Sequence, residues 1–129
     1  MTQYFGALIP FAAFCGVEPV ASDDDGARLR LELRADHGNN LGIAHGGVTC
    51  TLLDIAMGSA ARRATGLPVM TLDMQTSFIA PGRGVLLAEG RVLRAGHSVV
   101  FCVGEVRTEA GELVAKASGL FKPVKAKEA

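Results

Sequence analysis

A single carboxylate, Asp54, lies in the middle of an apolar stretch that runs from His45 to Ala61 and reads HGGVTCTLLDIAMGSAA. No other residue between Gly46 and Ala61 is charged. Burying a lone carboxylate is costly unless it is paired or its pKa rises until it is neutral. Such carboxylates often mark active sites, where they act as bases or nucleophiles. Asp54 is therefore either a hydrogen-bonded structural residue or a catalytic one, and the pattern alone leaves both open.

A second chemical feature, His45-Gly46-Gly47, precedes the carboxylate at the start of the same stretch. Free backbone N–H groups at a helix start can hold an anion or a developing oxyanion. Glycine also lets a ligand approach the backbone closely. The alternative is an ordinary loop-to-helix turn in which His45 lies near a cap position, and the tripeptide alone does not separate the two.

The spacing between these two features limits what one chain can do. Asp54 follows His45 by nine residues. On a helix this places the two side chains on opposite sides, about 13 Å apart along the axis. They cannot form a dyad within one chain. Either Asp54 is structural, or its partners come from another chain.

The elements that must position these residues follow from hydrophobic periodicity. Residues 47–65 form the one long helix that we predict, because they are apolar nearly all round and end before Gly66 and Pro68. Leucine alternates with charged residues over 28–35, which predicts a strand with one buried face, and residues 17–22 are its expected hairpin partner. Four further strands are expected at 69–79, 85–95, 98–108 and 113–122.

Short turns separate these strands, including Pro81-Gly82-Arg83-Gly84, so we expect antiparallel hairpins. The sum is an α+β domain of about five to six antiparallel strands wrapped around one buried helix. We interpret residues 1–129 as a single domain, with a helical arm over about 1–16 and a flexible tail over about 123–129.

Composition excludes several classes of protein. The 129 residues hold 13 basic and 13 acidic side chains, so the chain lacks the basic footprint of a nucleic-acid-binding protein. Its three cysteines form no CxxC motif, which argues against a disulfide framework or a zinc site and fits a reducing cytoplasm. The apolar run from Tyr4 to Val17 follows no Lys or Arg, unlike a signal peptide, and is too short to span a membrane.

The spaced motif resembles a known family. Asn39-x-x-Gly42-x-x-His45-Gly46-Gly47, followed by Leu53-Asp54 and Ala56, is similar to the signature of the phenylacetate-degradation (PaaI-type) acyl-CoA thioesterases of the hotdog fold. Further likeness lies in Thr71-Leu72-Asp73-Met74, in Phe78-Ile79-Ala80-Pro81 and in Gly111-Glu112-Leu113-Val114-Ala115. The resemblance covers the chain from about Phe11 to Lys122.

The resemblance implies a role for each matching residue. Asp54 would be the general base or the nucleophile, and the backbone N–H of Gly46 would hold the oxyanion. Asn39 would donate to the same carbonyl or orient water, His45 would order the loop and hydrogen-bond near the thioester, and Thr71 would help to position the attacking water. The remaining expected contacts are to substrate, by Gly47 at the helix start and by a turn made of Gly96, His97 and Ser98.

The resemblance also implies the assembly. Family dimers join two sheets edge to edge and build each site from both chains, which would bring Asp54 of one chain to Asn39, His45 and Gly46 of the other. We therefore expect a cytoplasmic acyl-CoA thioesterase acting on an aryl-acetyl or medium-chain substrate, without metal or cofactor, as a homodimer that assembles to a homotetramer. We expect no nucleic-acid or membrane partner. The alternatives are a hotdog enoyl-CoA hydratase or dehydratase and a non-catalytic acyl-CoA-binding protein.

Overall fold

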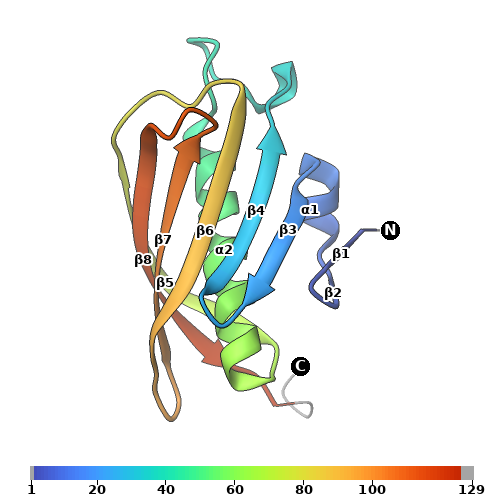
Figure 1. Ribbon diagram of the computed structural model, residues 1–129, viewed down its shortest axis with the longest axis vertical. Coiled ribbons are helices and arrows are strands. Elements are labelled where there is room, and N and C mark those ends of the chain that lie inside the picture. The colour runs from blue at the N-terminus through green and yellow to red at the C-terminus, as the bar shows by residue number, and fades with distance from the viewer. Residues whose placement is uncertain (1, 126–129) are drawn as a thin grey trace.

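A curved antiparallel sheet wraps around one long helix in the computed structural model, which describes residues 2–125 (Figure 1). Within those residues the sheet has six strands in the order β3-β4-β6-β7-β8-β5. The strands are β3 (Glu18–Asp23), β4 (Gly26–Glu32), β5 (Val69–Phe78), β6 (Val85–Ala95), β7 (Val100–Thr108) and β8 (Leu113–Pro123). The predicted α+β architecture is confirmed.

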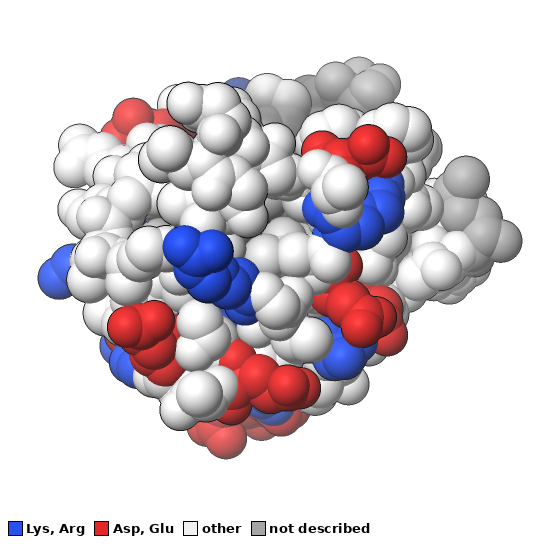
Figure 2. Space-filling view, turned by 90° about the horizontal axis from the view of Figure 1, so that it is seen from above, with Lys and Arg blue, Asp and Glu red and all other residues white. Residues whose placement is uncertain are grey.

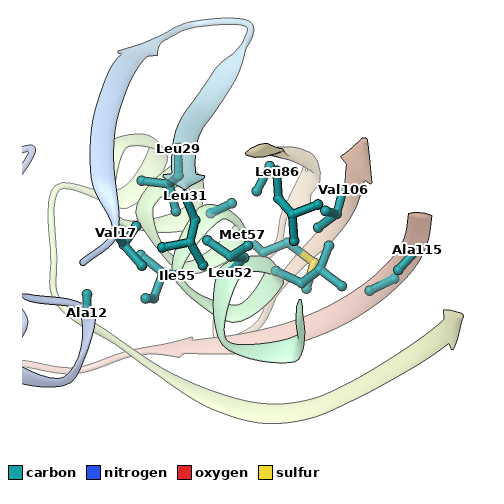
Figure 3. Packing of buried hydrophobic residues seen from close by; sticks show 14 of the residues in the cluster. Ala12, Val17, Leu29, Leu31, Leu52, Ile55, Met57, Leu86, Val106 and Ala115 are labelled. Atoms are coloured by element: carbon teal, nitrogen blue, oxygen red, sulfur yellow. The ribbon is translucent and has the colours of Figure 1, made fainter. Parts of the chain in front are cut away.

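The long helix α2 (Gly46–Thr65) begins one residue earlier than predicted. It ends at Gly66, whose positive φ of 71° suits glycine and whose N–H donates to the Arg62 carbonyl at 2.8 Å. Figure 3 shows Leu52, Ile55 and Met57 of α2 turned toward side chains of the sheet. These side chains are buried, so this face of the helix forms the core against the sheet.

One glycine of the sheet lets the helix pack this closely. A Cβ atom on Gly90 of β6 would lie 2.4 Å from the backbone of Ala56 and Met57. Any side chain at this position would push β6 away from α2. The contact holds the middle of α2 against the sheet, two to three residues after Asp54.

The connection from β5 to β6 corrects one prediction. The turn Pro81-Gly82-Arg83-Gly84 does not close a hairpin, because β5 pairs with β8 and β6 pairs with β4. Figure 1 shows this connection crossing from one side of the sheet to its middle. A short, turn-rich sequence fixes only that the chain changes direction. The partner of each strand is decided by which faces are buried in the whole sheet.

We expected the N-terminal arm to be helical, but only part of it is. Two short strands, β1 (Gln3–Tyr4) and β2 (Ala7–Leu8), form a hairpin that precedes the helix α1 (Pro10–Cys15). The hairpin is anchored by the buried Tyr4, whose hydroxyl donates to the Val17 carbonyl at 2.7 Å. Periodicity could not reveal strands of two residues.

The first residues of the predicted C-terminal tail belong to the folded domain. Strand β8 continues through Pro123, and Val124 is buried with its N–H donating to the Pro68 carbonyl at 2.8 Å. An apolar contact therefore holds Val124, which we had assigned to the flexible tail, against the folded domain. The rest of the predicted tail, residues 126–129, lies outside the described residues.

The two edges of the sheet differ in whether another segment of the chain covers them. Edge strand β3 lies beside the N-terminal segment, as Figure 1 shows. At the other edge, β5 leaves Met70, Leu72 and Phe78 at least half exposed.

Figure 2 shows the end that is uppermost in Figure 1, where acidic and basic side chains are mixed and a broad area holds neither. That end presents mixed charge and no basic patch among the described residues.

Candidate active site

Asp54 projects from the middle of α2 toward edge strand β5. The Thr71 hydroxyl donates a hydrogen bond of 2.5 Å to Oδ1 of Asp54. The bond fixes the orientation of the carboxylate, and Oδ2 has no hydrogen-bond partner among the described residues. A half-buried carboxylate with one oxygen held and the other open can accept a proton from a positioned water.

A cavity of about 760 Å³ opens beside this pair. Apolar side chains from the N-terminal hairpin, α2, β5 and β8 line much of it, and Asp54 and Thr71 lie on its wall. Gly58, one helical turn after Asp54, also lines the cavity and contributes no side chain to fill it. The carboxylate therefore borders a space that is large enough for an organic ligand.

The start of α2 leaves one backbone donor free. His45 is the N-cap, and its Nδ1 accepts the N–H of Gly47 at 2.8 Å. The His45 carbonyl accepts the N–H groups of Val48 at 3.0 Å and Thr49 at 3.4 Å. Of the first four N–H groups of the helix, that of Gly46 alone has no acceptor within the described residues.

This pattern separates the two glycines of the motif. The Gly46 N–H can stabilise negative charge on a ligand oxygen. The Gly47 N–H is already used by His45, which counts against a direct backbone contact from Gly47 to substrate. Because Nδ1 of His45 accepts the hydrogen bond from the Gly47 N–H, the imidazole ring orders the helix start. Its Nε2 is left to face solvent or substrate.

Asn39 is held in the loop before α2 by its own side chain. Its Oδ1 accepts the N–H groups of Leu41 at 2.9 Å and Ile43 at 3.3 Å, which orients the amide nitrogen away from the loop. The amide NH₂ has no acceptor among the described residues, so it can donate to a ligand carbonyl. The loop itself is tied to the β5–β6 connection by Ala44, whose N–H donates to the Gly82 carbonyl at 2.9 Å.

Two residues that shape this region had no predicted role in the site. His37 is buried, and its Nε2 lies 2.7 Å from the Cys15 carbonyl while its Nδ1 accepts the Arg34 N–H at 3.0 Å. It connects the loop to α1. The Phe78 ring lies 3.3 Å from the position that a Cβ on Gly46 would occupy, so it forms one wall at the helix start. A histidine in a polar loop and an aromatic residue at a strand end are too common to predict these roles.

One chain does not bring all the predicted site residues together. Asp54 and Thr71 border the large cavity, whereas Asn39 and Gly46 border another of about 340 Å³ with Phe78. The turn that contains Gly96, His97 and Ser98 joins β6 to β7 at the end of the molecule away from the loop before α2 (Figure 1). The helical spacing predicted this separation of His45 from Asp54.

Buried groups near the core have shifted pKa values. Burial raises the pKa of the Cys102 thiol to about 11. Burial, and secondarily the charge of Cys15, raises the pKa of Tyr4 above 10.0.

In residues 2–125 no cluster of three His, Cys, Asp or Glu side chains could hold a metal ion. No helix of this part of the chain combines the length and the apolarity that crossing a membrane requires.

Known proteins of one family are similar to this chain. The model of the thioesterase superfamily matches residues 41–115, more than half of the chain. A protein of Halobacterium salinarum, whose name proposes an esterase, is 38% identical over 94 residues. These residues are 67% of this chain and 62% of that protein, so the chain matches less than two thirds of this relative's length.

Two solved structures share the fold over nearly the whole chain. A protein of Bacillus halodurans solved with CoA is 30% identical, with a TM-score of 0.85 over 92% of this chain and 81% of its own. A phenylacetic acid degradation-related protein of Ralstonia eutropha is 26% identical, with a TM-score of 0.82 over 93% of this chain and 99% of its own. The resemblance and the hotdog fold predicted from the motif are confirmed. The chain belongs to the thioesterase superfamily, a family of thioester hydrolases.

Proposed function

We propose that the protein is an acyl-CoA thioesterase that hydrolyses an aryl-acetyl- or medium-chain acyl-CoA to the free acid and CoA. The observation that carries the proposal is the Asp54 carboxylate, held by Thr71 at the wall of a large cavity. Family membership supports a thioester as substrate. The CoA bound to the relative from Bacillus halodurans supports CoA as the thiol part.

The proposed reaction uses Asp54 as a general base. Asp54 takes a proton from water while the water oxygen attacks the thioester carbon, and the carbonyl oxygen becomes an oxyanion. The Gly46 N–H and the Asn39 amide donate to that oxyanion. The tetrahedral intermediate then expels the CoA thiolate, which receives the proton from Asp54. Thr71 keeps the carboxylate in place and helps to position the water.

Asp54 can also act as a nucleophile with the same surroundings. Its carboxylate oxygen then attacks the thioester carbon and expels the CoA thiolate, which leaves a mixed anhydride. Water hydrolyses the anhydride to the free acid and restores Asp54. The open Oδ2 serves either route, because the Thr71 bond occupies only Oδ1.

The proposed active unit is a homodimer, because the acceptor and the donors of one chain border different cavities. A second copy would place its Asn39, His45 and Gly46 opposite Asp54 of the first. Edge strand β5 supports this pairing, since it carries exposed Met70 and Leu72 beside a strand edge that no other described strand pairs with. Assembly of two dimers to a homotetramer, and contact of CoA with the turn at Gly96, His97 and Ser98, belong to the same proposal.

The proposed compartment is the cytoplasm. All three cysteines are free thiols in the described part of the chain, and Cys15 and Cys102 are buried. Free thiols without a disulfide framework are typical of a reducing compartment.

The test is thiol release from a panel of acyl-CoAs that spans short, medium, long and aryl-acetyl groups. The wild type should hydrolyse a subset of the panel. Asp54→Asn is nearly isosteric and should lower kcat/KM by roughly 100- to 10,000-fold with an unchanged fold. Asp25→Asn is the matched control, because Asp25 is an exposed carboxylate in the β3–β4 turn at the other edge of the sheet, and it should stay near the wild type.

The same panel separates the alternatives. Full activity of Asp54→Asn would contradict a catalytic role for this carboxylate. Loss of enoyl-CoA absorbance without thiol release would indicate a hydratase. Tight binding of acyl-CoA without turnover, in a folded wild type, would indicate a binding protein.

A further inference from the structure

The N-terminal β-hairpin covers the cavity beside Asp54 with a turn of unusual conformation. Strands β1 and β2 pair Tyr4 with Ala7, so Phe5 and Gly6 form a two-residue turn. Both have positive φ, 56° for Phe5 and 92° for Gly6, as type I′ turns require. Glycine adopts this conformation freely, whereas a bulky residue such as phenylalanine does so at a cost. This conformational free-energy cost indicates that the Phe5 side chain has a functional role.

Helix α2 holds this turn in place. Nη1 of Arg62 donates to the Phe5 carbonyl at 2.8 Å, and the same guanidinium lies beside Gly6. The Tyr4 hydroxyl anchors the preceding strand to Val17. With these two anchors, the Phe5 side chain packs against the core cluster and lines the cavity.

Asp54, Gly58 and Arg62 are spaced four residues apart and so lie along one face of α2. The helical rise places Arg62 about 12 Å from Asp54 along the axis. All three residues line the cavity, as Phe5 does. The cavity thus extends from the carboxylate, across a glycine without a side chain, to the turn that Arg62 holds.

The lining favours an apolar occupant. Ile9, Val69 and Phe121 contribute apolar surface between the two ends. The two cationic groups at the far end already have partners, since Arg62 binds the Phe5 carbonyl and Arg63 binds Asp24 at 3.1 Å and the Ser22 carbonyl at 3.3 Å. Both guanidinium groups therefore hold other segments of the chain in place.

We infer that this cavity takes the acyl group of the substrate and that Phe5, held by Arg62, closes its far end and sets the acyl length that the site accepts. The inference rests on the proposed thioesterase function, because it assigns the acyl side of that substrate. Phe5 is then a specificity-determining residue that acts at the end of the acyl chain remote from the thioester.

The test replaces Phe5 with residues that keep the turn. Phe5→Asn creates Asn-Gly and Phe5→Gly creates Gly-Gly, and both pairs favour type I′ turns, so the hairpin should form without the ring. The measurement is kcat/KM for a series from hexanoyl- to palmitoyl-CoA, with phenylacetyl-CoA alongside. In both variants the preferred chain should lengthen, and the ratio of long-chain to medium-chain kcat/KM should rise at least about tenfold.

Phe14→Ala is the matched control. Phe14 lies on α1 of the same arm, is 76% exposed and does not line the cavity. Its removal should leave the chain-length profile unchanged. An unchanged profile in Phe5→Asn and Phe5→Gly, with the wild type active, would overturn the inference.

A binding series separates this inference from the proposed activity. Titration calorimetry with S-alkyl-CoA thioethers of increasing length needs no turnover. A shift of the tightest-binding length in the Phe5 variants supports the acyl cavity even if the wild type hydrolyses nothing, in which case only the proposed activity fails. No shift in binding would overturn the inference whatever the activity.

Arg62 is tested as a positioning residue. Arg62→Met removes the donor to Phe5 and should lengthen the accepted chain in the same direction as the Phe5 variants. Arg62→Lys keeps a donor near the Phe5 carbonyl and should restore most of the wild-type profile. A rise in KM that is equal for all chain lengths in Arg62→Met would instead place CoA at Arg62 and overturn its role as a clamp.

Discussion

The two halves of the candidate site are built by different means. The loop half offers hydrogen-bond donors, the Gly46 N–H and the Asn39 amide, and a series of backbone bonds sets their positions. The helix half offers an acceptor, Asp54, which helical spacing and the Thr71 hydroxyl set in place. Hydrolysis needs both, since a proton must be accepted while charge develops on the carbonyl oxygen.

Neither half of the site can catalyse hydrolysis within a single chain. Each half borders its own cavity in one chain, so the donors and the acceptor act on one substrate only if a second copy joins them. A fault in the loop half and a fault in the helix half should therefore be repairable by exchange between chains.

Complementation between inactive chains is the strongest test of the comparison. Asn39→Ala and Asp54→Asn should each be nearly inactive alone. A mixture at equal amounts, after subunit exchange, should recover about a quarter of the wild-type activity, because half of the dimers are mixed and each mixed dimer has one intact site. Thiol release measures the recovery. No recovery in dimers proven to be mixed would contradict a site shared between chains.

One substitution can remove the backbone donor of the loop half. Gly46→Pro removes the free N–H, yet proline at the first position of a helix is well tolerated. We expect kcat to fall roughly 100- to 1,000-fold with little change in helix content by circular dichroism. Gly46→Ala is the control, because it keeps the N–H and adds a similar contact with Phe78. An equal loss in both variants would indicate crowding instead of a lost donor.

The helix half can be weakened at Thr71. Thr71→Val removes the hydroxyl that donates to Asp54, and Thr71→Ser keeps it. A hydrogen bond to a charged group is worth about 1.5–3 kcal/mol, so we expect about a tenfold loss of kcat/KM or more in Thr71→Val. Thr71→Ser should stay close to the wild type. Equal activity of Thr71→Val and the wild type would show that Asp54 needs no orienting partner.

The smallest effect concerns the hairpin that covers the helix half. Tyr4 is the sole tyrosine, so absorbance at alkaline pH reports its ionisation alone. Its folded pKa is raised above 10.0, chiefly by burial. Protonated Tyr4 therefore contributes stability that is complete below the unfolded value and is lost as the pH rises through the folded value. Phe5→Asn should not lower this pKa if the hairpin stays folded.

Much of the fold could be predicted because periodicity reports burial locally. Leucine alternation marked β4, and the apolar run around Asp54 marked α2 to within one residue. The β5–β6 connection could not be predicted, because strand pairing is a property of the whole sheet. The hairpin at Phe5 and the role of His37 were also missed, since each depends on one distant contact, with Arg62 and with Cys15.

By itself the sequence determined the long helix, the lone carboxylate within it and the opposition of Asp54 to His45, because these follow from the fixed geometry of a helix. The motif determined the family. The tertiary structure decided which N–H is free at the helix start, which hydroxyl holds Asp54 and which segment covers the cavity beside it. Those features join residues far apart in the chain, and only the packing of the whole sheet around α2 brings them together.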